Sequence, residues 1–291
     1  MLEKYKKACV LCGQVYFTFF MNYKDGEYIC NNCKNKCLIY NNSNLNLYSN
    51  KELKNSIEQK KSVLEIREDE HIQLRKKEYL ESLSSIKILH PKISENPIKK
   101  QYLKDIPEIT YSQIRKNTPL PKLENFISID TETTGLSASS DEVVEISAVK
   151  FVNSEPVECL TTLLKPKNEI SERITNINHI TNEMVENSPE IGSVIESFSN
   201  FIKGFNIVGY NLDFDLRFLF VNVLDFFSEK RQFFDALDLS RKLYKYKLDN
   251  FKLDTVAEEM ELYRTQAHRA TEDAFVTGII FRDLGKYLIT H

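Results

Sequence analysis

Residues 125–135 read Asn-Phe-Ile-Ser-Ile-Asp-Thr-Glu-Thr-Thr-Gly, a short apolar run that leads into two acidic residues and a glycine. Because residues i and i+2 of a strand project from the same face, Asp130 and Glu132 are expected to project together from the end of a buried strand. Two neighbouring carboxylates raise each other's pKa unless a cation lies between them. Oxygen ligands suit Mg²⁺ or Mn²⁺. The stretch therefore predicts a strand that carries part of a divalent-metal site.

The segments around this strand predict an α/β domain over residues 123–291. Further β-rich runs cover 142–151, 157–164 and 206–210. Helical patterns cover 171–185, 189–203, 214–225, 253–262 and 268–288. Strands followed by alternating helices indicate a mixed sheet flanked by helices.

A second acidic motif, Gly-Tyr-Asn-Leu-Asp-Phe-Asp over residues 209–215, follows an apolar strand and opens a helix. Asp215 shares a helical face with Phe218 and Leu219, so it is expected to face inward. Asp213 is the competing candidate, but it fits better as an exposed first-turn residue that the helix dipole stabilises. Asn211 is either an N-cap of this helix or part of the site.

A third motif, His-Arg-Ala-Thr-Glu-Asp-Ala over residues 268–274, opens the last helix. Asp273 heads an apolar stripe that includes Thr277 and Ile280, and a buried aspartate is costly without a partner. A metal ion would be that partner. His268, five residues earlier, stands where the helix begins and is a candidate to lean over the site.

The three motifs, in their order along the chain, resemble those of the DEDDh 3′→5′ exonucleases. They are Asp-Thr-Glu-Thr-Thr-Gly, Tyr-Asn-Leu-Asp-Phe-Asp and His-Arg-Ala-Thr-Glu-Asp-Ala. This family includes the proofreading epsilon subunit of bacterial DNA polymerase III. The resemblance covers about residues 123–291. It implies an RNase H-like fold and an enzyme that hydrolyses phosphodiester bonds at nucleic-acid 3′ ends, releasing nucleoside 5′-monophosphates.

The same resemblance assigns roles to individual residues. His268 would be the general base. Two Mg²⁺ or Mn²⁺ ions would be held by Asp130, Glu132, Asp215 and Asp273. The terminal nucleotide would be contacted by Thr131, Thr134, Leu136 and Asn211. Leu136 would wedge against the last base, although an ordinary packing leucine is the alternative.

Two positions depart from the usual family pattern. Asn178 and His179 stand where relatives commonly have His-Gly or Thr-Gly, and Tyr210 replaces a frequent histidine. The Asn178-His179 departure lies at the edge of the substrate region and so bears on strand preference or end geometry. Neither departure touches a metal ligand.

The first 40 residues contain five of the six cysteines. Cys9 and Cys12 form one Cys-x2-Cys pair, and Cys30 and Cys33 form a second after seventeen intervening residues. This spacing suits four thiolates around one structural Zn²⁺, and a reduced compartment favours metal binding over disulfides. Between the pairs, two β-rich runs flank Asp-Gly, a hairpin signal, so residues 1–40 resemble a zinc ribbon. Cys37 is a spare or an alternative ligand.

Two segments connect the cysteine module to residue 123. Residues 41–90 lack glycine and proline and predict a charged helix, either solvated or paired in a coiled-coil dimer. Residues 91–122 hold five of the eight prolines and predict an extended, partly ordered linker.

Charge is unevenly distributed along the chain. Residues 1–124 carry 22 Lys and Arg against 15 Asp and Glu, whereas residues 125–291 carry 17 against 27. The basic half either contacts phosphates or merely keeps the protein soluble. Its ribbon could grip nucleic acid or dock on a protein, such as a polymerase or another replication or repair factor.

The N-terminus shows no apolar signal core, and no apolar run is long enough for a membrane span, so we expect a cytoplasmic protein. The leading expectation is an exonuclease acting on single-stranded DNA 3′ ends in replication or repair. RNA trimming on the same scaffold, and a non-catalytic adaptor, are the alternatives.

Overall fold

The structure, a computed structural model, describes residues 6–11, 14–17, 21–24, 27–30, 33–34, 36–37, 48–59, 61, 63–98, 109–220, 231–262 and 269–291. The chain forms two compact units, Met1–Lys77 and Glu78–His291, and the boundary falls within one long helix. Among the described residues, none of the helices combines the length and apolar character needed to cross a bilayer.

The second unit is built on a six-stranded mixed sheet in the order β10-β9-β6-β7-β8-β5. Strand β6 pairs antiparallel with β7 and parallel with β9, and β8 pairs antiparallel with β7. Strands β10 and β5 add in parallel at the two ends of the sheet. Their bounds are β5 Lys87–Leu89, β6 Phe126–Thr133, β7 Val143–Val152, β8 Glu155–Leu163, β9 Asn206–Gly209 and β10 Phe233–Asp235.

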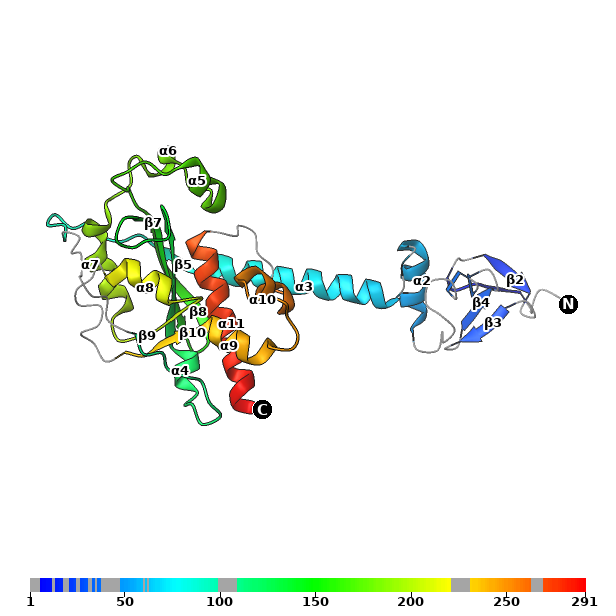
Figure 1. Cartoon of the computed structure of the whole chain (residues 1–291). Coiled ribbons are helices and arrows are strands. Elements are labelled where there is room, and N and C mark those ends of the chain that lie inside the picture. Colours follow the sequence, from blue (N-terminus) through cyan, green and yellow to red (C-terminus); the bar gives the residue numbers. More distant parts are fainter. Residues whose placement is uncertain are drawn as a thin grey trace. The chain divides into compact units, whose positions relative to one another are not determined.

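Helices cover both faces of this sheet (Figure 1). Along β6, Phe126 packs against Phe281 of α11, whereas Ile127 and Ile129 belong to the core beneath α7 and α8. This period of two follows from strand geometry and directs even-numbered residues of β6 toward α11. The helices of this unit are α4 Pro121–Glu124, α5 Glu172–Asn178, α6 Asn182–Val185, α7 Ile191–Ile202, α8 Asp213–Phe220, α9 Ala236–Tyr244, α10 Leu253–Glu259 and α11 Ala270–Thr290. The predicted mixed sheet flanked by helices is confirmed.

The single helix expected over residues 171–185 is wrong, because the chain forms α5 and α6 instead. His179 ends α5 in the left-handed conformation with φ of 61°. The buried side chain of Asn178 then accepts the backbone N–H of Ile180 at 3.1 Å. The Asn178-His179 departure from the family pattern therefore lies at a turn between two short helices.

The described residues between 78 and 125 belong to the second unit and pack on its sheet and helices. After α3 (Val63–Ser85), strand β5 extends the sheet beside β8. The chain next runs along α7, where the N–H of Ile98 bonds the carbonyl oxygen of Gly192 at 2.8 Å. A Cβ on Gly192 would lie 2.1 Å from the Ile98 oxygen, so only glycine allows this approach. Tyr111 then bridges Phe233 of β10.

The described part of the expected 91–122 linker is thus extended and hydrogen bonded to the domain, and residues 99–108 lie outside the described residues. We call residues 78–125 the strap. Strand β5 was not anticipated within the helical segment 41–90, which contains α2 (Asn50–Gln59) and α3. A three-residue strand carries too short a pattern to be distinguished from the end of a helix.

The first unit contains two small antiparallel sheets. Strand β1 (Lys6–Ala8) pairs with β2 (Val15–Phe17), and β3 (Met21–Lys24) pairs with β4 (Glu27–Cys30). A small core gathers Cys9, Leu11, Ile29, Cys33, Cys37 and Leu53. In a module of about 40 residues, a hydrophobic core supplies little stability by itself.

Because a fragment beginning at residue 123 lacks most of the strap, we expect it to be less stable than a fragment beginning at residue 63. Tyr79, Ile86 and Ile114 of the strap are buried in the core beside α11, and each contributes about 1.5–3 kcal/mol of hydrophobic stabilisation. Urea unfolding followed by circular dichroism should give the shorter fragment a clearly lower midpoint. Equal midpoints would show that the strap contributes nothing to the stability of the sheet unit.

Candidate active site

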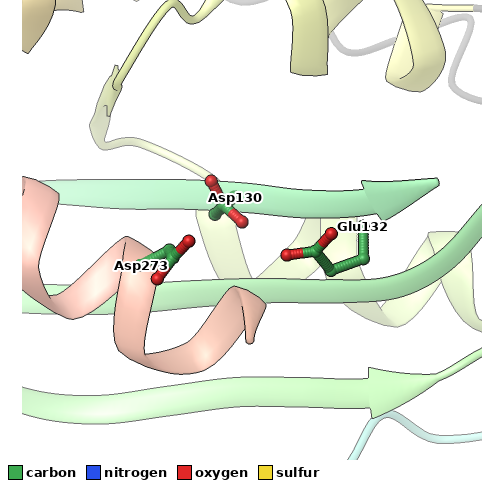
Figure 2. A group of neighbouring side chains, drawn as sticks. All are labelled: Asp130, Glu132 and Asp273. Carbon is green, nitrogen blue, oxygen red and sulfur yellow. The ribbon is translucent and has the colours of Figure 1, made fainter. Parts of the chain in front are cut away.

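Three carboxylates converge at the end of β6 and the first turn of α11. Figure 2 shows Asp130 and Glu132 on one strand, with Asp273 facing them from the helix. One side-chain oxygen from each residue lies within 4.8 Å of the others. Asp130 and Glu132 share the α11 face of β6 because they are two residues apart, as the sequence predicts.

Burial makes these carboxylates reluctant to ionise. It is the main reason that the pKa of Glu132 rises to about 8, and the charge of Asp273 adds to it. Burial, followed by the charge of Asp215, raises the pKa of Asp130 well above its ordinary value. Burial likewise raises the pKa of Asp215 to about 7. A divalent cation would reverse this cost by offsetting the negative charges.

Asp215 lies in the first turn of α8 and is 3% exposed, as expected of an inward-facing residue. The Thr131 hydroxyl donates to Asp215 Oδ1 at 2.7 Å. Asp213, the competing candidate, instead pairs with Arg217 at 2.5 Å, with about half of each side chain exposed. The structure therefore separates the two acids of this motif, one turned inward and one turned outward.

Thr131, which the family resemblance implies as a substrate contact, lies between the two acids of β6. Its side chain is 6% exposed, and its hydroxyl is bonded to Asp215. As an odd-numbered residue of β6, it points away from Asp130 and Glu132 toward α8. The side chain of Thr131 is thus placed to orient an acidic residue.

The loop after β6 is folded back on itself. Thr134 exchanges hydrogen bonds with Glu142: the Thr134 N–H donates to the Glu142 carbonyl at 2.8 Å, and Thr134 Oγ1 accepts the Glu142 N–H at 2.9 Å. A Cβ on Gly135 would lie 2.4 Å from the Asp141 carboxylate. This tight loop leaves Leu136 85% exposed, which favours a contacting role over an ordinary packing one.

Asn211 precedes α8 in the left-handed conformation, with φ of 61°. Its N–H donates to Asp235 Oδ1 at 3.0 Å, and Asp235 also accepts the N–H of Leu212 and of Leu237. The carboxylate of Asp235 thereby caps α9 and holds the loop that leads to Asp215. Asn211 itself is exposed.

Glu145 and Arg269 are functional candidates that the sequence reasoning missed. Glu145 lies opposite Glu132 across β6 and β7 and is 3% exposed. It accepts two hydrogen bonds from Arg269, at 2.8 and 3.1 Å, and a third from the Ala270 N–H at 3.1 Å. This bidentate ion pair anchors the start of α11, and both oxygens of the Glu145 carboxylate accept hydrogen bonds there. The adjacency of Arg269 to the motif's histidine was the available signal.

The predicted general base, His268, and one predicted zinc ligand, Cys12, lie outside the described residues. For Cys30, another predicted zinc ligand, the structure describes only the backbone, which is part of β4. Cys9, Cys33 and Cys37 are buried in the first unit. The sixth cysteine, Cys159, is fully buried in the core of the sheet unit.

These features define a nuclease-type acidic site on a mixed α/β sheet, and the comparisons with known proteins agree. The sequence model of the exonuclease family matches residues 127–281, more than half of the chain. The protein therefore belongs to the exonuclease family and is a nuclease hydrolase. Asp130, Glu132, Asp215 and Asp273 all lie within the matched segment.

Curated relatives of this segment include PolC-type DNA polymerases III. The relative from Caldanaerobacter subterraneus is 40% identical over 157 residues, which cover 54% of this chain and 11% of that protein. The Thermotoga maritima relative is 39% identical over 158 residues, covering 54% and 11%. The match thus spans about a tenth of the length of these relatives.

Among solved structures, an exonuclease I superimposes with a TM-score of 0.51 at 19% identity, covering 58% of this chain and 44% of the other. E. coli exonuclease I in complex with a dT13 oligonucleotide gives a TM-score of 0.50 at 18% identity, covering 58% and 44%. At such identities the likeness shows the fold, which is the RNase H-like α/β fold that the sequence predicts.

Because of the repulsion in the acidic cluster, we expect Asp130→Asn to be more stable than the wild type when no metal is bound. Carboxyls with a raised pKa stabilise the fold at pH values below their unfolded pKa of about 4, and this stabilisation is lost as the pH rises through about 7–8. At pH 8 without metal, Asp130→Asn should therefore melt higher than the wild type because it removes one repelling charge. With Mn²⁺, the wild type should gain stability and the variant should gain less.

Thermal melts with EDTA or Mn²⁺, at pH 6 and pH 8, measure both effects. Asp213→Asn is the matched control, since Asp213 is half exposed and paired with Arg217. An Mn²⁺-dependent rise that is equal in wild type and Asp130→Asn would contradict a metal site at this cluster.

Proposed function

We propose that the sheet unit is a metal-dependent 3′→5′ exonuclease that acts on DNA ends in replication or repair. The observation that carries the proposal is the convergence of Asp130, Glu132 and Asp273 within 4.8 Å, with Asp215 buried beside them. Similarity to PolC-type DNA polymerases III favours DNA over RNA as the substrate and favours a polymerase as a partner.

The residues divide the chemistry between holding metal, moving a proton and gripping the strand. Asp130, Glu132, Asp215 and Asp273 would hold two divalent cations. When bound, such ions lower the pKa of water and neutralise charge at the scissile phosphate. His268 would accept the proton of the attacking water, as the general base. Thr134, Leu136 and Asn211 would contact the terminal nucleotide.

The arrangement around the acids supports these roles. The Thr131 hydroxyl fixes one oxygen of Asp215. The Glu145–Arg269 pair fixes the start of α11, whose first turn carries Asp273. Fixed ligands reduce the reorganisation that a reaction would otherwise require. Leu136, 85% exposed at the rim, offers an apolar surface to a terminal base.

The test compares 5′-labelled DNA and RNA single strands of matched sequence, with free or blocked 3′ ends. Purified full-length protein should shorten the free DNA strand from its 3′ end, only with Mg²⁺ or Mn²⁺, and release nucleoside 5′-monophosphates. His268→Ala should lose roughly 10²–10⁴-fold in rate while still binding Mn²⁺, because it removes only general-base assistance. Asp130→Asn should lose both metal binding and turnover.

Each outcome bears on one part of the proposal. Undiminished cleavage in excess EDTA would contradict the two-metal mechanism. Faster cleavage of RNA than of DNA would make the enzyme an RNA trimmer. Wild-type rates for His268→Ala would leave the four acids as the catalytic groups and exclude a histidine base. A protein that binds strands without cleaving them would be an adaptor.

We further propose that the first unit binds one structural Zn²⁺ through Cys9, Cys12, Cys30 and Cys33. Burial of Cys9 and Cys33 in one core supports the proposal, since a module of about 40 residues needs stability beyond its hydrophobic core and a bound metal would supply it. Four thiolates leave no open coordination position, which favours a structural ion. Cys37, also buried in this core, is the alternative ligand.

Metal analysis should find about one zinc per chain. The double variant Cys30→Ser, Cys33→Ser should lose it, because two of the four thiolates are removed. Cys159→Ser is the control, since Cys159 is buried in the sheet unit, and it should keep its zinc. Full zinc retention in the double variant would exclude a site built on these cysteines.

A further inference from the structure

Successive residues at the start of α11 make hydrogen bonds to different elements of the unit. Arg269, just before the helix, bonds Glu145 of β7, and the Thr271 hydroxyl donates to Thr161 of β8 at 3.0 Å. The next side chain, Glu272, is 4% exposed and accepts the Tyr79 hydroxyl at 3.0 Å. Asp273 follows and faces the acids of β6 (Figure 2).

Tyr79 comes from α3, ahead of the segment that the family model matches. Its ring is 7% exposed and meets Phe275 of α11 edge-on, with 5.2 Å between centroids. The tyrosine thus holds α11 at two points, by its hydroxyl at Glu272 and by its ring one turn further along. Both contacts lie within one compact unit.

We propose that Tyr79 is a positioning residue for the acidic site, acting through Glu272 on the orientation of Asp273. Consecutive side chains of a helix are about 100° apart, so a rotation of the first turn that frees Glu272 also turns Asp273 away from Asp130 and Glu132. Metal ligands tolerate displacements of only about 0.5 Å. The inference rests on the proposed role of Asp273 as a metal ligand.

The strap therefore has a second consequence besides stability. The family's own segment supplies the four acids, while a helix outside that segment fixes the angle at which one of them is presented. Tyr79→Phe tests this directly, because it removes one oxygen and retains the ring that packs on Phe275.

In the full chain, Tyr79→Phe should raise the Mn²⁺ concentration that gives half-maximal activity by about 10-fold, the low end of what loss of an outer-shell partner costs. KM for a single-stranded DNA oligonucleotide should stay unchanged at saturating Mn²⁺, because the variant leaves the strand-gripping loops intact. Tyr287→Phe is the matched control at the other end of α11, where the ring is 54% exposed.

Two further variants separate positioning from stability and from the proposed function. Ile86→Ala removes a buried strap residue that packs in the same core, so it should lower the melting temperature without changing the Mn²⁺ requirement. Asp273→Asn should abolish activity. If Tyr79→Phe matches wild type in its Mn²⁺ requirement, or changes only the melting temperature as Ile86→Ala does, the positioning role is overturned. If Asp273→Asn stays active, the proposed metal site itself fails.

Discussion

Repulsion among carboxylates held out of water is the constraint on which the rest of the structure depends. Asp130, Glu132 and Asp273 are drawn together, although the charge of Asp273 raises the pKa of both Asp130 and Glu132. Such an arrangement opposes folding unless other contacts offset it. Those contacts include the Glu145–Arg269 pair at the start of α11, the Thr131–Asp215 hydrogen bond on the other face of β6, and the stacked rings of Phe126 and Phe151 in the core of the unit.

Strand geometry decides how the contacts that support the acidic site are arranged. On β6, even-numbered side chains meet α11 and odd-numbered ones meet α8, so one eight-residue strand serves two helices. Asp130 and Glu132 reach Asp273 on one side, while Thr131 between them reaches Asp215 on the other. The carboxylates that a divalent cation would need are therefore delivered from both faces of a single sheet.

Local patterns sufficed to predict the central strand, the helical faces and the inward acids. The pairing of Asp130 with Glu132 follows from the two-residue repeat, and the inward placement of Asp215 follows from its position above Phe218. The break at His179 could not be predicted, because a left-handed residue inside a helical pattern leaves no periodic signal. Glu145 and Arg269 lie 124 residues apart, and nothing local links two charged residues at that separation. For the same reason, the charged helix predicted over residues 41–90 gives no sign that Tyr79 reaches Glu272, 193 residues further along the chain.

The strap also governs how the sheet meets its surroundings. A sheet edge presents unpaired N–H and C=O groups to which another chain can add. Here β5 covers β8, a nine-residue strand, and replaces it at the edge with three residues that begin with an exposed lysine. At the opposite end, Tyr111 bridges β10, itself only three residues long. Chain that precedes the family segment thus lies at both rims of the sheet, where the outermost strands are short. Short edges offer another chain few groups to pair with, so the strap limits strand-by-strand self-association as well as supporting the site.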